Sequence, residues 1–404
     1  MRPAVWFGAD VLLHRREGAA FRERLRGRRV ALVAHPASVD ARLRPVWELI
    51  DALPDVRLTA LLSPQHGFAG EKQDNMVESA DAVHPTLRVP ILSLYGETRR
   101  LREEWMDLFD VLLFDLQDVG VRVYTFLTTL GYLLEDLAGR ADRELWVLDR
   151  PNPAGRCVEG LTVQPGQESF VGLAPMPMQH GLTLGECACW YRRSADLDVR
   201  LEVVPMLGWD PLAPWPQQRV WLQPSPNMPA LATARAYPGT VLLEGTTLSE
   251  GRGTTRPLSL VGHPQVDWSE VRRRLEDCCP DVMNGLVLRD VSFEPTFHKH
   301  VGQVCPGFEL VTVDPVYDAL ACRPYRLIAA ILRSVRELHP GLPLWRDPPY
   351  EYEPDRLPID VIAGGPALRR WVDGADGSSW DAWNDRLRAD ERAWERLTEA
   401  FRRY

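Results

Sequence analysis

The chain has 404 residues, 45% of them hydrophobic and 25% charged, and a formal net charge of −9 at neutral pH. The length predicts two or three domains, and the composition excludes a largely disordered chain. The acidic balance disfavours nucleic-acid partners, and no run of about 18 apolar residues is present to span a membrane.

The N-terminus and the cysteines predict a cytoplasmic protein. Asp10 follows too soon after Met1 for an apolar signal peptide to fit between them. The seven cysteines are odd in number, and their spacing matches neither a disulfide framework nor a zinc site. We therefore expect free thiols in a reducing compartment.

The first half alternates short apolar runs with stretches of helical spacing. The runs are nearly continuous rather than alternating, which is typical of strands covered on both faces. They occupy residues 29–34, 57–62, 90–94, 111–116, 145–148 and 201–204. The helical stretches occupy residues 41–53, 98–109 and 124–137. This alternation predicts right-handed βαβ units and a Rossmann-like, doubly wound, mostly parallel sheet.

A proline-rich break separates the two halves. Three prolines fall within residues 211–216, and we interpret the surrounding segment as a linker. The predicted domains are therefore 1–215 and 222–404. In the second, Asp267 and Glu270 form a capping box that opens a helix, residues 325–338 form another, and residues 379–403 form an amphipathic helix that docks onto a core.

Polar side chains follow successive apolar runs, at the rim where an open parallel sheet binds its ligand. These side chains predict a functional cleft at that rim. They are Gln65, His66, Asp115, Gln117, Asp118, Arg122, Tyr124, Asp149 and Asn152.

Nucleotide and serine-hydrolase motifs are absent from the sequence. No glycine-rich dinucleotide fingerprint follows the first run, and neither a phosphate-binding loop nor a Gly-x-Ser-x-Gly elbow occurs. A nicotinamide cofactor is therefore not expected.

Two polar loops lie in the second half. Asn227 stands between prolines that fix the backbone, and residues 244–256 combine glycines and hydroxyls with Glu244, Glu250 and Arg252. Such groups suit a polyhydroxylated ligand, and an arginine suits a carboxylate. The alternative is a polar turn held by local hydrogen bonds.

Motifs along nearly the whole chain resemble one family. They include Pro-Gln-His-Gly at 64–67, Asp-Leu-Gln-Asp-Val-Gly-Val-Arg-Val-Tyr at 115–124 and Asp-Arg-Pro-Asn-Pro at 149–153. Others are His-Gly-Leu-Thr-Leu-Gly-Glu at 180–186, Pro-Ser-Pro-Asn-Met-Pro at 224–229 and Ser-Glu-Gly-Arg-Gly-Thr-Thr at 249–255. The sequence thus resembles the NamZ-type exo-β-N-acetylmuramidases, glycoside hydrolases that remove terminal N-acetylmuramic acid from peptidoglycan fragments.

The resemblance implies a Rossmann-like N-terminal domain, a smaller C-terminal α/β domain and an active-site cleft between them. It implies an amino-sugar or muropeptide substrate, a role in cell-wall recycling and no cofactor. One position departs from the pattern, because Gln65 stands where better-known members carry a glutamate. An amide cannot transfer a proton as a carboxyl group does. Either another acid replaces it, such as Glu71 or Glu78, or this branch has a different activity.

Glycoside hydrolysis generally needs two carboxyl groups beside the scissile bond. The catalytic candidates are Asp118, Asp115, Glu250, His66 and Glu71. The substrate-binding candidates are Gln65, Gln117, Arg122, Tyr124, Asn152, His180, Asn227, Glu244 and Arg252. Several carry a structural alternative: Arg122 pairs with Asp118 instead of a lactyl carboxylate, Asn152 fixes a turn, and His180 orders the loop before a helix that Thr183 and Glu186 cap.

Two other functions remain open. The first is a protein of the same fold that binds such sugars without cleaving them, which Gln65 motivates. The second is a metal-dependent hydrolase using His66, Asp115 and Asp118, whose ligand types suit Mg²⁺, Mn²⁺ or Zn²⁺.

Overall fold

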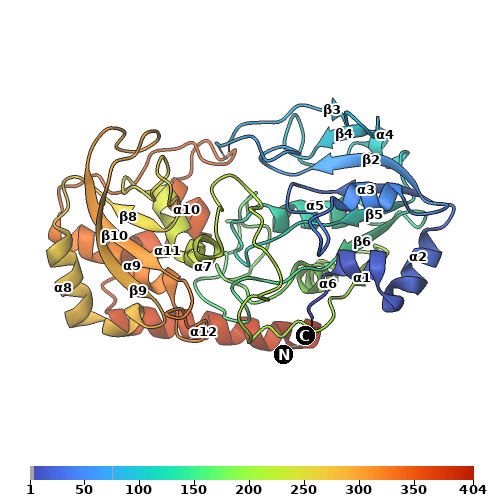
Figure 1. Cartoon of the computed structure of the whole chain (residues 1–404). Coiled ribbons are helices and arrows are strands. Elements are labelled where there is room, and N and C mark those ends of the chain that lie inside the picture. Colours follow the sequence, from blue (N-terminus) through green and yellow to red (C-terminus); the bar gives the residue numbers. More distant parts are fainter. Residues whose placement is uncertain (1–3, 75) are drawn as a thin grey trace.

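Two β-sheets stand at opposite ends of the molecule (Figure 1). The computed structural model describes residues 4–74 and 76–404. The larger sheet has seven strands in the order β3-β4-β2-β1-β5-β6-β7, and the smaller has three in the order β8-β10-β9.

The larger sheet is formed by the six apolar runs of the first half. These strands are mutually parallel, and only the short edge strand β3 runs antiparallel to its neighbour. The strands are β1 (Arg29–Val33), β2 (Arg57–Ser63), β3 (Ala82–Val83), β4 (Pro90–Ser93), β5 (Val111–Phe114), β6 (Glu144–Leu148) and β7 (Leu201–Val204). The predicted doubly wound sheet is confirmed.

Helices cover both faces of this sheet because its strands are apolar on both. On β1, Val30 and Leu32 pack into one core with α1, α2 and α3, whereas Ala31 and Val33 pack into the other with α4, α5 and α6. These helices are α1 (Gly8–His14), α2 (Ala19–Leu25), α3 (Val46–Asp51), α4 (Glu103–Met106), α5 (Phe126–Asp136) and α6 (Leu184–Ser194).

Two helices are shorter than the spacing of apolar residues predicts. The side chain of Asp40 accepts hydrogen bonds from the backbone N–H groups of Arg42 and Arg44, and Leu43 has a φ of 62°. This local turn delays α3 until Val46. Likewise, α4 covers only Glu103–Met106 of the predicted stretch 98–109.

The second half contains a small antiparallel sheet packed against helices. Its strands are β8 (Leu260–Gly262), β9 (Val287–Phe293) and β10 (Cys305–Val311), and its helices are α7 (Leu231–Thr240), α8 (Trp268–Cys278), α9 (Pro324–Leu338), α10 (Pro358–Ala363) and α11 (Ala367–Val372). The predicted helix after Asp267 is present, with Asp267 as its N-cap, and so is the helix predicted at 325–338.

The last helix, α12 (Trp380–Thr398), runs beneath both halves (Figure 1). Trp383 stacks on Trp371 of α11, and Trp394 contacts Trp190 of α6, each pair with ring centroids 4.7 Å apart. The predicted docking of this tail is therefore present. The predicted boundary at 215–222 lies between the two sheets in the chain, but one apolar core runs from the large sheet through α9, α11 and α12.

No helix among residues 4–74 and 76–404 is long and apolar enough to cross a membrane. All seven cysteines are free thiols.

Candidate active site

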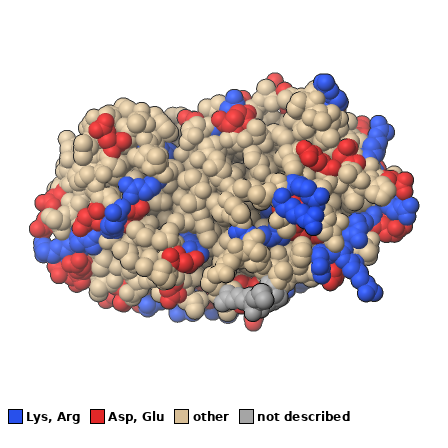
Figure 2. All heavy atoms as spheres, viewed as in Figure 1, with Lys and Arg blue, Asp and Glu red and all other residues tan. Residues whose placement is uncertain are grey.

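A small pocket with a cavity volume of about 40 Å³ lies where loops of the two halves meet. We call it the inner pocket. Figure 2 shows that uncharged residues cover much of the junction on this face, while charged residues gather mainly toward the two ends. The polar side chains that line the inner pocket are Gln65, His66, Tyr124, Thr125, Ser225, Asn227, Tyr237, Glu244, Arg252, Tyr350 and Glu351.

Gln65 links the two halves through its side-chain amide. It follows β2, and its Oε1 accepts a hydrogen bond of 2.6 Å from the hydroxyl of Thr125, the N-cap residue of α5. Its Nε2 donates to Oε1 of Glu351 over 3.1 Å. An amide can accept and donate at once, so Gln65 fixes the position of Glu351 as well as its own.

Glu351 is a buried carboxylate that faces the inner pocket. Its Oε2 accepts a hydrogen bond of 2.9 Å from the phenol of Tyr95. Burial, reinforced by the charge of Glu351, raises the pKa of Tyr95, so this phenol stays protonated as a donor. Glu351 and Tyr352 have φ angles of 43° and 68°, and such strain in non-glycine residues is concentrated at functional sites.

Glu244 is a second carboxylate lining the inner pocket. It lies in the 3₁₀ helix η2 (Val241–Gly245), where a Cβ on Gly245 would come within 2.6 Å of the backbone of Ile359. Glycine therefore allows η2 to approach α10 closely. Oε1 of Glu244 accepts from Arg252 over 2.7 Å, and Oε2 accepts from the phenol of Tyr350 over 2.8 Å.

Glu250 lies behind Arg252, outside the inner pocket. It contacts Lys299 Nζ at 2.7 Å, His298 Nδ1 at 3.2 Å and Arg252 Nε at 3.4 Å. Burial opposes its charge, yet these neighbours hold the pKa of Glu250 well below its ordinary value. Glu250 is thus an ionised anchor that positions Arg252.

His66 is neutral at physiological pH. Burial lowers the pKa of His66 to about 4, and Nδ1 donates to the carbonyl of Lys72 over 2.8 Å. Nε2 therefore carries the lone pair and is a hydrogen-bond acceptor. Asn227 is held by reciprocal bonds with Gln73, 2.7 Å between side chains and 3.0 Å from its Nδ2 to the Gln73 carbonyl.

The carboxylates at the end of β5 do not line the inner pocket. Asp115 is fully buried and receives two hydrogen bonds from Arg150, of 2.6 and 2.8 Å. Asp118 accepts the backbone N–H of Gly120 over 2.7 Å and lies 3.7 Å from Nε2 of His180. Both acids stabilise the loop around them, so the expectation that they face the cleft is not met.

Three of the side chains that we expected to bind substrate, those of Arg122, Asn152 and His180, form hydrogen bonds with the backbone instead. Arg122 donates to the carbonyls of Val171 and Ile362 instead of pairing with Asp118. Asn152 donates to the carbonyl of Leu182 and accepts from Ala154.

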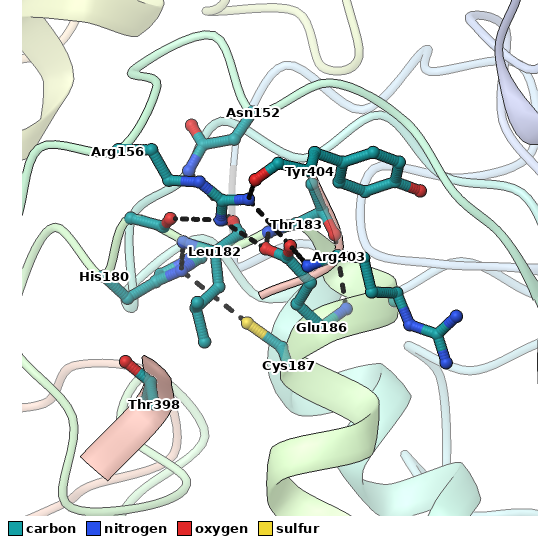
Figure 3. Close-up of polar contacts among 12 residues, drawn as sticks. Asn152, Arg156, His180, Leu182, Thr183, Glu186, Cys187, Thr398, Arg403 and Tyr404 are labelled. Carbon is teal, nitrogen blue, oxygen red and sulfur yellow. Dashed lines mark hydrogen bonds and ion pairs between the residues drawn. The ribbon is translucent and has the colours of Figure 1, made fainter. Parts of the chain in front are cut away.

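His180 accepts the N–H of Leu182 beside the Thr183–Glu186 capping box, where Arg156 and the Arg403 backbone also bind Glu186 (Figure 3). This box is present as predicted.

Gln117 lies in a different hollow. Its Nε2 donates to the carbonyls of Asp118 and Pro151. It lines a pocket of about 320 Å³ together with Arg150, at the β1–β5 boundary where the strand order reverses. This boundary is the usual ligand crevice of such sheets, but the inner pocket is set to one side of it. We call this second hollow the switch-point pocket.

The two acids proposed to replace residue 65 are exposed. The carboxylate of Glu71 packs beside Gly67, where a Cβ would lie 2.6 Å from Oε1. Glu78 accepts a hydrogen bond from Tyr352 over 3.4 Å. Neither lines the inner pocket.

A metal centre is not supported by the arrangement of possible ligands. Across the described part of the chain, no three His, Cys, Asp or Glu side chains come together in a group that would hold a metal ion. Asp115 and Asp118 are engaged by Arg150 and Gly120, as described above.

Sequence reasoning missed Glu351, Tyr350 and Tyr95. The first two belong to Pro-Pro-Tyr-Glu-Tyr-Glu at 348–353, a loop that follows no predicted strand. The alternation of Tyr and Glu after two prolines was the available signal.

Comparisons with known proteins identify the family of this chain. A family model for the N-terminal part of the exo-β-N-acetylmuramidase NamZ matches residues 30–232, and the model for its C-terminal part matches residues 235–404. The peptidoglycan β-N-acetylmuramidase NamZ of Bacillus subtilis (strain 168) is 36% identical over 342 residues, which cover 84% of this chain and 79% of the relative.

Two crystal structures of DUF1343 family proteins from Bacteroides fragilis NCTC 9343 have the same fold. One is 26% identical with a TM-score of 0.84 and covers all of both chains. The other is 25% identical with a TM-score of 0.76, covering 100% of this chain and 99% of its own. The expected class of activity, an exo-acting glycosidase, is confirmed by the family matches. The chain therefore belongs to the NamZ family of exo-β-N-acetylmuramidases.

Proposed function

We propose that the protein releases terminal N-acetylmuramic acid, or a related amino sugar, from the ends of peptidoglycan fragments. The observation that carries this proposal is the inner pocket, which is lined by two buried carboxylates of the second half, Glu244 of the 3₁₀ helix η2 and Glu351 of the loop before α10. Two carboxyl groups are what glycoside hydrolysis generally requires. The hydroxyl, amide and carboxylate groups that line the inner pocket suit the hydroxyl and amide groups of one sugar at a chain end.

Glu351 serves as the carboxylate that acts on the sugar. Gln65 and Tyr95 donate hydrogen bonds to its two oxygens and hold the carboxylate in place. A fixed carboxylate of this kind suits a base or a nucleophile. The acid lost at residue 65 is thus replaced by one that Gln65 itself orients.

Glu244 acts as the acid for the leaving group, and Arg252 binds the lactyl carboxylate of the substrate. Arg252 donates a hydrogen bond to Glu244 over 2.7 Å. A lactyl carboxylate bound to Arg252 would therefore place the terminal sugar beside Glu244.

Purified protein tests this proposal with a β-linked N-acetylmuramyl disaccharide. We expect release of the terminal sugar, and Glu351→Gln and Glu244→Gln should each lower kcat/KM by about 10²–10⁴-fold. Glu78→Gln, at an exposed acid of the neighbouring loop, is the control. No sugar release by the wild type, or full activity in both pocket variants, would contradict the proposal.

A non-catalytic sugar-binding protein is the second candidate, because Gln65 occupies a position where a carboxylate is expected. Calorimetry that detects binding of the disaccharide, with no product after prolonged incubation, would establish it. A product that accumulates in proportion to enzyme concentration would exclude it.

We place this reaction in the cytoplasm, in the recycling of cell-wall fragments. The seven free thiols are typical of proteins in a reducing compartment. Cell fractionation should recover the protein with cytoplasmic markers, and recovery from the medium would contradict this placement.

A further inference from the structure

A third hollow, with a cavity volume of about 250 Å³, adjoins the inner pocket. We call it the outer chamber. The two share Glu244, Arg252 and Tyr350, so these side chains form the boundary between them. The other residues of the outer chamber are Gln73, Asp74, Met76, Phe297, His298 and Arg346.

The position of Glu244 at this boundary decides what the outer chamber can hold. If the terminal sugar fills the inner pocket, as in the proposed function on which this inference rests, the scissile bond lies beside Glu244. The part of the substrate beyond that bond must then enter the outer chamber. We infer that the outer chamber is the leaving-group site, where a pyranose ring lies against Phe297 and an acidic substituent binds Arg346.

Phe297 and Met76 provide an apolar surface in the outer chamber. Phe297 is 44% exposed, and Met76 is 40% exposed. Ligand pockets are lined mainly by apolar and aromatic side chains, with a few polar groups that fix the orientation of the ligand. The C–H face of a pyranose ring is the part of a sugar that an aromatic ring can cover.

The loop that carries Phe297 is anchored on several sides. Thr296 donates from its backbone N–H and its hydroxyl to the carbonyl of Gly253, both over 2.9 Å. A Cβ on Gly253, whose φ is 81°, would come within 2.4 Å of the Phe297 carbonyl. Beyond Phe297, His298 and Lys299 bind Glu250. Phe297 is therefore presented on a preorganised wall, which lowers the entropic cost of binding.

Arg346 provides a positive charge without a carboxylate partner among the described residues. One N–H of its guanidinium donates to the backbone carbonyl of Glu244 over 2.9 Å. This bond ties Arg346 to the chamber boundary and leaves other donors of the guanidinium for a ligand. An arginine placed in this way suits a carboxylate, such as those of an acidic peptide attached to the next sugars.

Substrates that differ only beyond the scissile bond test this inference. N-acetylmuramyl β-fluoride has no ring to place in the outer chamber, the disaccharide has one, and a trisaccharide with an acidic peptide on its last sugar adds the charge. Phe297→Ala should lower kcat/KM for the disaccharide about tenfold and leave the fluoride unchanged. Arg346→Gln should lower kcat/KM about tenfold more for the peptide-bearing trisaccharide than for the disaccharide.

The controls are Leu320→Ala and Arg57→Gln, which remove an exposed apolar and an exposed basic side chain elsewhere. Thermal unfolding confirms that each variant is folded. Equal losses on fluoride and disaccharide in Phe297→Ala, or no loss on either, would overturn the inference while the proposed function stands. A wild-type enzyme inactive on the fluoride and on the disaccharide would overturn the proposed function and the inference with it.

Discussion

Gln65 changes the charge of the site but keeps hydrogen bonds to both of its neighbours. Its carbonyl accepts from Thr125 and its amide donates to Glu351. A carboxylate at the same place would accept from Thr125 but would face Glu351 with a like charge. The amide therefore keeps a single negative charge at this point of the inner pocket.

Gln65→Glu should make residues 65 and 351 share a proton. Two carboxyl groups at hydrogen-bond distance cannot both ionise readily, so one apparent pKa of the pair rises. We expect the acid limb of the kcat/KM profile to move to higher pH relative to the wild type. Gln65→Asn, which adds no charge, is the control. Superimposable profiles for Gln65→Glu and the wild type would contradict this prediction, because they would show that a charge at residue 65 does not affect the protonation of Glu351.

His66 should make stability fall on acidification. Its pKa is about 4 when folded, against an ordinary value of 6.5, so between these values only the unfolded chain binds the proton. The free energy of unfolding therefore rises with pH across this window, and about 3 kcal/mol of it is lost as pH falls from 6.5 to 4. In His66→Asn, which suits the φ of 77°, urea unfolding should depend less steeply on pH there. Parallel pH profiles for the two proteins would contradict this assignment.

At the scale of elements, the bounds of the strands could be predicted from the sequence more closely than the residues at which the helices begin. Continuous apolar runs become strands because both sheet faces are covered, which fixes β1, β2, β4, β5, β6 and β7 to within about two residues. Helix α3 begins later than predicted because the Asp40 turn offers the backbone a competing set of hydrogen bonds.

Strand-end polar residues were harder to interpret than the strands. Gln65 and His66, which follow β2, line the inner pocket, whereas Asp115, which follows β5, forms a buried ion pair with Arg150. A buried acid at a strand end can therefore have a structural role as well as a catalytic one. The sequence does not show which residue pairs with it.

Gly253→Ala tests the anchoring of the loop that carries Phe297. The new Cβ would meet the Phe297 carbonyl in a left-handed backbone, so we expect a loss of stability of more than about 1 kcal/mol. Gly27→Ala is a matched control, because Gly27 has a similar φ of 73° and nothing within 4 Å. Thermal unfolding of both variants provides the comparison. Equal losses would mean that the backbone conformation alone matters and that Gly253 does not hold the loop.

At the scale of the molecule, the inner pocket depends on both halves and on the way they are joined. Glu351 meets Gln65 across 286 positions of the chain, a contact that no local pattern predicts. The sequence did predict that Gln65, His66, Tyr124, Asn227, Glu244 and Arg252 share a cleft, and these six side chains line the inner pocket. The shared core and α12 hold the halves in the orientation that makes this possible.

A crystal structure of the Glu351→Gln variant with an uncleaved N-acetylmuramyl disaccharide is the most direct test of this account. We predict the terminal sugar in the inner pocket, its lactyl carboxylate at Arg252, and the glycosidic oxygen beside Glu244. Density for the disaccharide in the switch-point pocket beside Gln117 and Arg150, with the inner pocket empty, would contradict it.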